Sequence, residues 1–81
     1  MKFTKYFEYR REKSDRKLIR DEWIQSVIDA PEAKQIQSDG RIKLWGKIGE
    51  ASGRYLRVIL LPDGVTVHNA FFDRDFEARR Q

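Results

Sequence analysis

Cysteine is missing from this chain of 81 residues, and histidine occurs only once. Without cysteine, a disulfide framework, a thiolate metal site and a thiol nucleophile are all excluded. One histidine does not make a zinc site unless carboxylates or a second subunit complete it. The sequence also lacks metal-ligand spacing, a glycine-rich phosphate loop and a nucleophile elbow. We therefore expect a protein that holds no metal and no cofactor.

Long apolar runs and a signal-peptide pattern are lacking as well. A membrane-spanning helix needs about 20 consecutive apolar residues, and no stretch of this sequence has that character. We therefore expect no membrane partner and a cytoplasmic location. A chain of this length is expected to form one domain, residues 1–81, that buries only about 60% of its unfolded surface.

Positive charge is in excess, because 17 lysines and arginines face 13 acidic residues. The sequence pI is about 9.6. One basic group lies within residues 2–20. The second lies in the later apolar runs, at Arg41, Lys43, Lys47, Arg54 and Arg57. This distribution favours an anionic partner, and the alternative is a solvated surface rich in lysine and arginine.

Apolar periodicity predicts two helices in the first part of the chain. Residues 3–13 carry Phe3, Tyr6 and Phe7 at helical spacing. A second helix is predicted from about residue 20 to residue 30, with one apolar stripe made by Ile19, Trp23, Ile24, Val27 and Ile28. Pro31 ends it, because the residue before a proline disfavours the helical region.

The rest of the chain reads as strands. Residues 41–48, 54–61 and 65–72 each alternate or run apolar between turn signals, and residues 32–38 suggest a weak edge strand. A charged tail, 73–81, follows. This order predicts an α+β fold in which two N-terminal helices pack on a three- to four-stranded antiparallel β-meander.

Alternation assigns two faces to the predicted sheet. The side toward the helices receives Ile42, Leu44, Leu56, Val58 and Leu60. The open side receives Lys43, Trp45, Lys47, Tyr55 and Arg57. A three-residue turn at 62–64 would place Leu61 opposite Val65 and Arg57 beside Asn69, with His68 toward the helices. A two-residue turn would bring His68 to the open face instead. The preference of proline for the first turn position favours the three-residue turn, and the face of His68 stays open.

Four segments in order resemble the RelE-like toxin superfamily, above all its small BrnT-like members. They are IRDEWIQSVIDAP at 19–31, DGRIKLW at 39–45, GRYLRV at 53–58 and VHNAFFDR at 67–74. The resemblance implies helices on a curved antiparallel sheet, metal-independent cleavage of mRNA and a partner antitoxin that covers the active face. It also implies catalytic residues among Arg57, His68, Asn69 and Arg74. One departure is that related short domains often carry a histidine in the first helix, where this chain has Tyr9 nearest by spacing.

RNA cleavage without a metal needs the ribose 2′-OH deprotonated, the phosphate charge neutralised and the leaving oxygen protonated. Arg57 suits the phosphate because a guanidinium is a planar fork of donors, although an arginine can also lie along a solvated sheet face. His68 suits proton transfer near neutral pH, and its alternative is a structural role. Asn69 would orient a ribose or a base.

The predicted strands also carry candidate RNA-binding residues. Trp45 and Tyr55 would stack unpaired bases, while Lys43, Lys47 and Arg54 would attract phosphates. A packing role for Trp45 and a merely solvated role for the lysines are the alternatives. The cluster at 73–75, Asp-Arg-Asp, suggests an internal salt-bridge group that positions the tail, or a route for Arg74 to the site.

These observations lead to one principal hypothesis and two alternatives. The principal one is a toxin-like, metal-independent endoribonuclease of a type II toxin–antitoxin pair, with RNA and a small acidic antitoxin protein as partners. The first alternative is a non-catalytic module that binds a protein or a nucleic acid through its basic sheet. The second is an inhibitor of an enzyme such as gyrase. Whether the chain forms a homodimer is left open.

Overall fold

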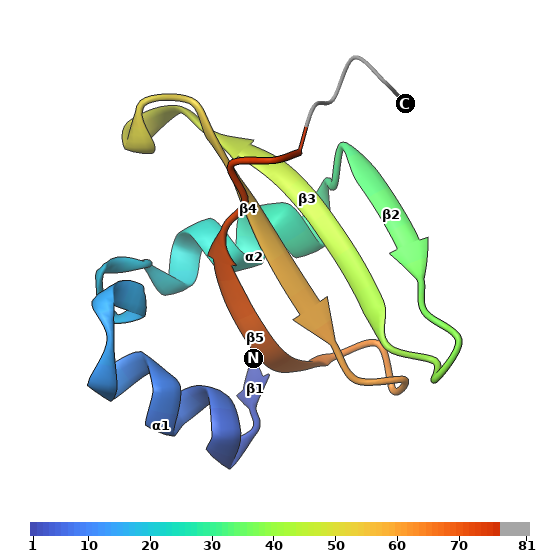
Figure 1. The fold of residues 1–81 in the computed structure, drawn as a ribbon. Helices are drawn as coiled ribbons and strands as arrows, with labels where there is room; N and C mark the ends of the chain where they lie inside the picture. Colours follow the sequence, from blue (N-terminus) through green and yellow to red (C-terminus); the bar gives the residue numbers. More distant parts are fainter. Residues whose placement is uncertain (77–81) are drawn as a thin grey trace.

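The computed structural model describes residues 1–76, apart from the side chain of Asp15. The helices are α1 (Lys5–Lys13), α2 (Asp21–Asp29) and short 3₁₀ helices at Asp15–Leu18 and Gly49–Ala51. The strands are β1 (Lys2–Phe3), β2 (Ala33–Ile36), β3 (Ile42–Ile48), β4 (Arg54–Leu60) and β5 (Thr66–Phe72). Within the described residues they make one five-stranded sheet in the order β1-β5-β4-β3-β2 (Figure 1). The α+β fold predicted from the sequence is confirmed.

Both predicted helices are present, and local chemistry sets where they begin and end. Thr4 caps α1 because its hydroxyl oxygen accepts the Phe7 N–H at 3.1 Å. Phe7 is fully buried. In α2 the buried residues are Ile24 and Val27, and the helix ends before Pro31 as the sequence predicts.

The expectation of a purely antiparallel sheet with three to four strands is wrong in detail. The sequence pattern places Phe3 in a helix, but Lys2–Phe3 forms β1 and runs parallel to β5, with Lys2 opposite Thr66 and Phe3 opposite Val67. The sheet of the described residues is therefore mixed and has five strands. A strand of two residues is too short to show alternation, so nothing in the sequence separates it from the helix that follows.

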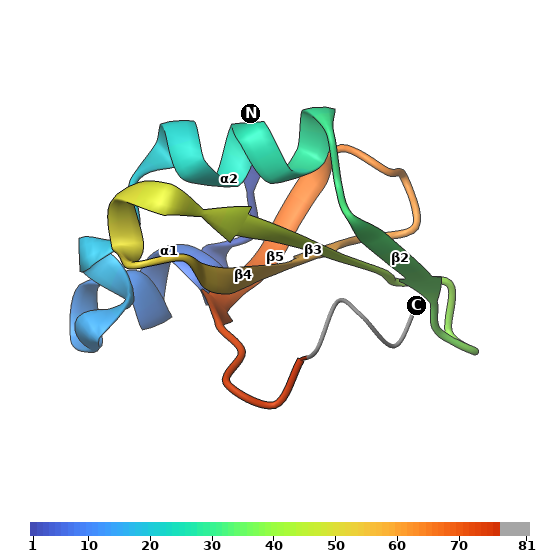
Figure 2. The same cartoon turned by 90° about the horizontal axis from the view of Figure 1, so that it is seen from above.

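The core lies between the sheet and α2. Leu56 and Val58 of β4 are fully buried and belong to one cluster with Ile24 and Val27 of α2. At Gly46 of β3 the helix comes so close that an added Cβ would lie 2.9 Å from Val27 Cγ2. Figure 2 shows α2 on one side of the sheet and the chain that follows β5 on the other. The helix-facing side predicted from alternation therefore holds the core.

The register between β4 and β5 differs from the predicted one. Arg57 lies opposite Phe71 instead of Asn69, and the ladder shifts between Ile59 and Leu60, where β5 carries His68 as an extra residue. The connection is also longer than predicted, because the Leu61 N–H donates to the Thr66 carbonyl at 2.9 Å. Within this connection the Asp63 carboxylate accepts the N–H groups of Val65 and Thr66, which stabilises the longer turn.

Asp63 should make the stability of the fold depend on pH in the acidic range. Hydrogen bonds from the Thr66 hydroxyl and from the Val65 and Thr66 amides lower the pKa of Asp63 from 3.8 to about 2. A carboxyl group with a lowered pKa stabilises the fold fully above 3.8, and this contribution is lost as the pH falls toward 2. We expect Asp63→Ala to lower the melting temperature at pH 6 and to have a shrinking effect below pH 4. An equal effect at pH 6 and pH 2 would contradict this prediction.

Candidate nucleic-acid interface

The side of the sheet away from α2 brings together most of the predicted binding residues. In the β3–β4 ladder Trp45 lies opposite Arg57, and Lys47 lies opposite Tyr55. Directly opposed residues project to the same face of a sheet. Lys43 lies on this face too, opposite Ile59. We call this side of the sheet the open face.

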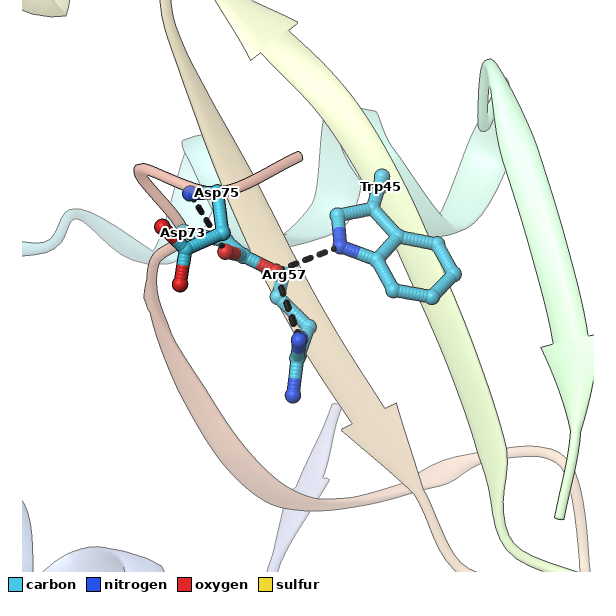
Figure 3. Close-up of polar contacts among 4 residues, drawn as sticks. All are labelled: Trp45, Arg57, Asp73 and Asp75. Carbon is cyan, nitrogen blue, oxygen red and sulfur yellow. Dashed lines mark hydrogen bonds and ion pairs between the residues drawn. The ribbon is translucent and has the colours of Figure 1, made fainter. Parts of the chain in front are cut away.

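The chain that follows β5 crosses the open face and holds its arginine. The Asp73 carboxylate accepts hydrogen bonds from Arg57 Nε at 3.0 Å and Arg57 Nη2 at 2.6 Å. The same oxygen accepts from the indole Nε1 of Trp45 at 3.0 Å (Figure 3). The tail cluster thus supplies an internal salt bridge, and Arg57 already has an anionic partner within the chain.

Phe76 completes this covering segment, which we call the tail strap (residues 73–76). Its ring lies nearly parallel to the Trp45 indole, with centroids 4.9 Å apart and planes inclined by 11°. The ring also contacts Tyr55, with 5.0 Å between centroids. Only 7% of Trp45 stays exposed. A base can therefore reach this predicted stacking residue only if the strap moves.

The protonation of Asp73 and Tyr55 follows from these contacts. Burial alone would raise the pKa of Asp73, but hydrogen bonds from Trp45, Arg57 and the Asp75 amide, with the charge of Arg57, bring its pKa below 3.8. Burial, followed by the hydrogen bond to Glu32 and the charge of Glu32, raises the pKa of Tyr55 above 10.0. Asp73 is therefore ionised and Tyr55 protonated at neutral pH.

A second feature, the arginine pocket, lies beside the open face. This pocket of about 470 Å³ is lined by Arg16, Leu18, Ile19, Arg54, Phe71, Phe72 and Arg74. Its apolar wall comes from β5 and from the turn before α2. Its three guanidinium groups face no carboxylate among the lining side chains that the structure describes. Two of the predicted site residues, Arg54 and Arg74, belong to it.

Aromatic rings hold two of these arginines. The Arg54 guanidinium carbon lies 4.0 Å from the Phe72 ring centroid, and its Nε donates to the Ala51 carbonyl at 3.0 Å. The Arg16 guanidinium carbon lies 5.4 Å from the centroid of Phe71, and its buried Nε has no hydrogen-bond partner. Arg74 is exposed. Among the described residues, none of the three forms an ion pair.

The remaining predicted catalytic residues are engaged elsewhere. His68 stacks on Tyr6 of α1, with ring centroids 4.9 Å apart, and its Nδ1 is buried without a hydrogen-bond partner. Burial and then the charge of Arg41 lower the pKa of His68 below 6.5. Asn69 accepts the Ala70 N–H on its side-chain oxygen at 2.9 Å. Neither residue lines the arginine pocket.

Several contributors to the interface were missed by the sequence reasoning. Phe71 lies within the predicted strand and could have been placed beside Arg57 with the observed register, whereas Phe76 follows β5 in a segment without strand structure, which alternation does not describe. Arg16 gave no signal, because it lies in a 3₁₀ helix between two periodic segments. Among the described residues no cluster of three metal-ligating side chains occurs. Nor does any helix described here have the length and apolar character that a bilayer crossing needs.

Comparison of the chain with known protein families, with curated proteins and with solved structures finds no match in any of the three. The likeness to RelE-like toxins therefore stays a prediction.

The ion pair between Arg57 and Asp73 should stabilise the fold. With only 8% of its side chain exposed, Asp73 would keep a nearly buried charge without its main partner in Arg57→Ala. We expect that variant to lower the free energy of unfolding by about 1.5–3 kcal/mol, measured by urea denaturation at pH 7. Asp73→Ala combined with Arg57→Ala should cost less than the sum of the two single changes.

Arg41→Ala is the matched control for this cycle. Arg41 pairs with Asp39 at 3.7 Å, and about half of each side chain is exposed, so its loss should cost less than about 1 kcal/mol. A cost for Arg57→Ala no larger than that of Arg41→Ala would show that Arg57 is only a solvated residue.

Proposed function

We propose that the protein binds RNA, with a phosphate group held in the arginine pocket. The observation that carries the proposal is the meeting of Arg16, Arg54 and Arg74 in one pocket that no described acidic side chain lines. Guanidinium groups bind phosphate oxygens through parallel N–H donors. Phe72 and Phe71 hold the guanidinium groups of Arg54 and Arg16 at the pocket, which fixes donors that a phosphate can use.

The apolar side of the pocket supports a nucleotide over a simple inorganic anion. Phe71 and Phe72 contribute lining area beside the arginines, and aromatic rings together with arginine planes are the usual platforms for unpaired bases. A volume of about 470 Å³ is within the range of small-molecule sites. The choice of RNA over DNA rests on the resemblance to RelE-like toxins alone.

Binding should lose strength and salt dependence when Arg74 is removed. Each phosphate contact to a single strand contributes a slope of about 0.7 to the fall of log K with log salt concentration. We expect Arg74→Ala, and likewise Arg54→Ala, to weaken binding of a short single-stranded RNA at least about fivefold and to reduce the slope by about 0.7. Fluorescence anisotropy at several salt concentrations measures both.

Lys34→Ala is the control for charge alone. Lys34 is exposed on β2, which lies at the opposite edge of the sheet from β5 and β1. Lys34→Ala also removes one positive charge, but from a position that does not line the arginine pocket. If Lys34→Ala and Arg74→Ala weaken binding equally, the attraction is non-specific and the proposed site is wrong.

Metal-independent cleavage of RNA is the second candidate. The same three arginines would neutralise the charge that builds up on a phosphate during cleavage. Proton transfer is the difficulty, because no histidine, tyrosine or carboxylate among the described residues lines the pocket. His68, with its lowered pKa, is neutral at pH 7 and would act only as a base.

The cleavage candidate is tested with a structured mRNA incubated in EDTA and mapped for cut ends. The ribonuclease hypothesis expects discrete cuts that disappear in both Arg74→Ala and His68→Ala. Intact RNA under conditions where the wild-type protein binds it would contradict cleavage of free RNA and leave binding alone.

The other predicted partners remain proposals of the same kind. A small acidic antitoxin would suit the arginine pocket in charge, as a phosphate does. Inhibition of an enzyme such as gyrase has no particular described residue to support it. A type II toxin–antitoxin role therefore follows from the resemblance and from this charge alone.

A further inference from the structure

We propose that the tail strap occupies a nucleotide subsite on the open face, and that a single-stranded RNA bound at the arginine pocket replaces Phe76 on Trp45. This inference rests on the proposed RNA-binding function and names both its substrate class and the way in which the site is closed. The strap offers an anion to an arginine and a flat ring to a tryptophan. In a nucleotide the phosphate would replace the anion, and the base would replace the ring.

The contact between Phe76 and Trp45 has the geometry of a stacked base. Their planes are inclined by only 11° at a centroid distance of 4.9 Å. Trp45 does not belong to the core cluster on the helix side, so its cover comes from the open face. The Arg57 guanidinium carbon lies 5.4 Å from the Trp45 centroid. A base in place of Phe76 would keep both the stacking and the neighbouring cation.

The anion of the strap is held as a phosphate oxygen would be. One Asp73 oxygen accepts two N–H groups of Arg57 and the indole N–H of Trp45. All three donors come from the rigid strands β3 and β4, so they remain in place when the strap leaves. A phosphate oxygen accepts hydrogen bonds from the same kinds of donor.

The subsite is continuous with the arginine pocket. A second hollow, of about 250 Å³, is lined by Arg54, Tyr55, Phe72, Asp73, Arg74 and Phe76. It shares Arg54, Phe72 and Arg74 with the arginine pocket. An RNA chain that leaves the pocket along this shared wall meets Phe76 next. Only an unpaired base can take the place of the ring, so the surface selects single strands over duplexes.

Among the described residues, few contacts hold the strap beyond Asp73. The Asp73 N–H donates to the Tyr55 carbonyl at 2.9 Å, and the Asp75 N–H donates to the Asp73 side chain at 3.0 Å. Arg74 and Asp75 are exposed. The contacts that must break are therefore the stack of Phe76 on Trp45 and the hydrogen bonds that Asp73 accepts from Arg57 and Trp45, whereas β5 and the core stay as they are.

The test measures RNA binding in Phe76→Ala with Phe76→Tyr as the control that keeps an aromatic ring. The probe is an RNA of about twelve nucleotides of mixed sequence, single-stranded or paired with its complement and used below the melting temperature of the duplex, and the readouts are anisotropy and tryptophan fluorescence. We expect Phe76→Ala to bind the single strand about threefold to tenfold more tightly, the range that loss of one competing aromatic pair gives. Phe76→Tyr should match the wild type. Binding to Phe76→Ala should quench tryptophan fluorescence, and this quenching should be missing when Trp45→Phe is added, since only Trp23 then remains.

Different results separate the two proposals. If Phe76→Ala binds the single strand no better than Phe76→Tyr, while Arg74→Ala still weakens binding, the subsite is wrong and the RNA-binding function stands. Equal affinity of Phe76→Ala for the single strand and the duplex would also overturn the subsite. If neither protein binds RNA, both proposals fall. A peptide with acidic and aromatic residues that displaces the strap where RNA does not would identify a protein as the occupant.

Discussion

The Asp73 carboxylate is the acceptor around which the open face is organised. A charged group with so little exposure is tolerated only where donors satisfy it, and its donors come from two different strands, Arg57 on β4 and Trp45 on β3. One side chain therefore fixes the direction in which the chain leaves β5. That direction brings Phe76 over Trp45 and places Arg74 at the arginine pocket. Asp73 therefore determines both how the open face is covered and which residue of the strap lines the arginine pocket.

The contact with Asp73 explains why the apolar strand β4 can hold a charged residue, Arg57. Arg57 lies between Leu56 and Val58, both fully buried on the other side of the sheet, and its own side chain is only 25% exposed. Its partner in this structure is a carboxylate of the same chain. The guanidinium is thus held in one orientation before any ligand arrives, which reduces the entropy that binding would cost. Structural and binding roles of such an arginine are compatible, because the internal partner can be exchanged.

Much of the fold could be predicted because it depends on local patterns. The stripe that includes Ile24 and Val27 and the break at Pro31 define α2, and alternation defines β3 and β4. The parallel pairing of Lys2–Phe3 with β5 could not be predicted, since two residues carry no period and their partner lies more than sixty positions away. The bulge at His68 was hidden for another reason. The turn that contains Asp63 is longer than the sequence predicts. The pairing of β4 with β5 then shifts by one residue between Ile59 and Leu60.

The candidate site was predictable in its residue types and less so in its contacts. An arginine and a tryptophan on one face follow from alternation, but their shared acceptor, Asp73, follows β5, and only the tertiary path of that segment returns it to the sheet. Arg16 and Phe71 meet because the 3₁₀ helix before α2 turns back toward β5. Such meetings depend on tertiary packing, which periodicity does not report.

The order of the strands also limits how this sheet can grow. In the described residues its two edges are β1, which has only two residues, and β2, which has four. Strand addition is therefore confined in practice to β2, where Lys34, Gln35 and Ile36 are exposed. A lysine on an edge strand discourages pairing of that edge with the edge strand of another chain. The longest strands, β3 to β5, thereby lie in the interior of the sheet, where both of their edges are already paired.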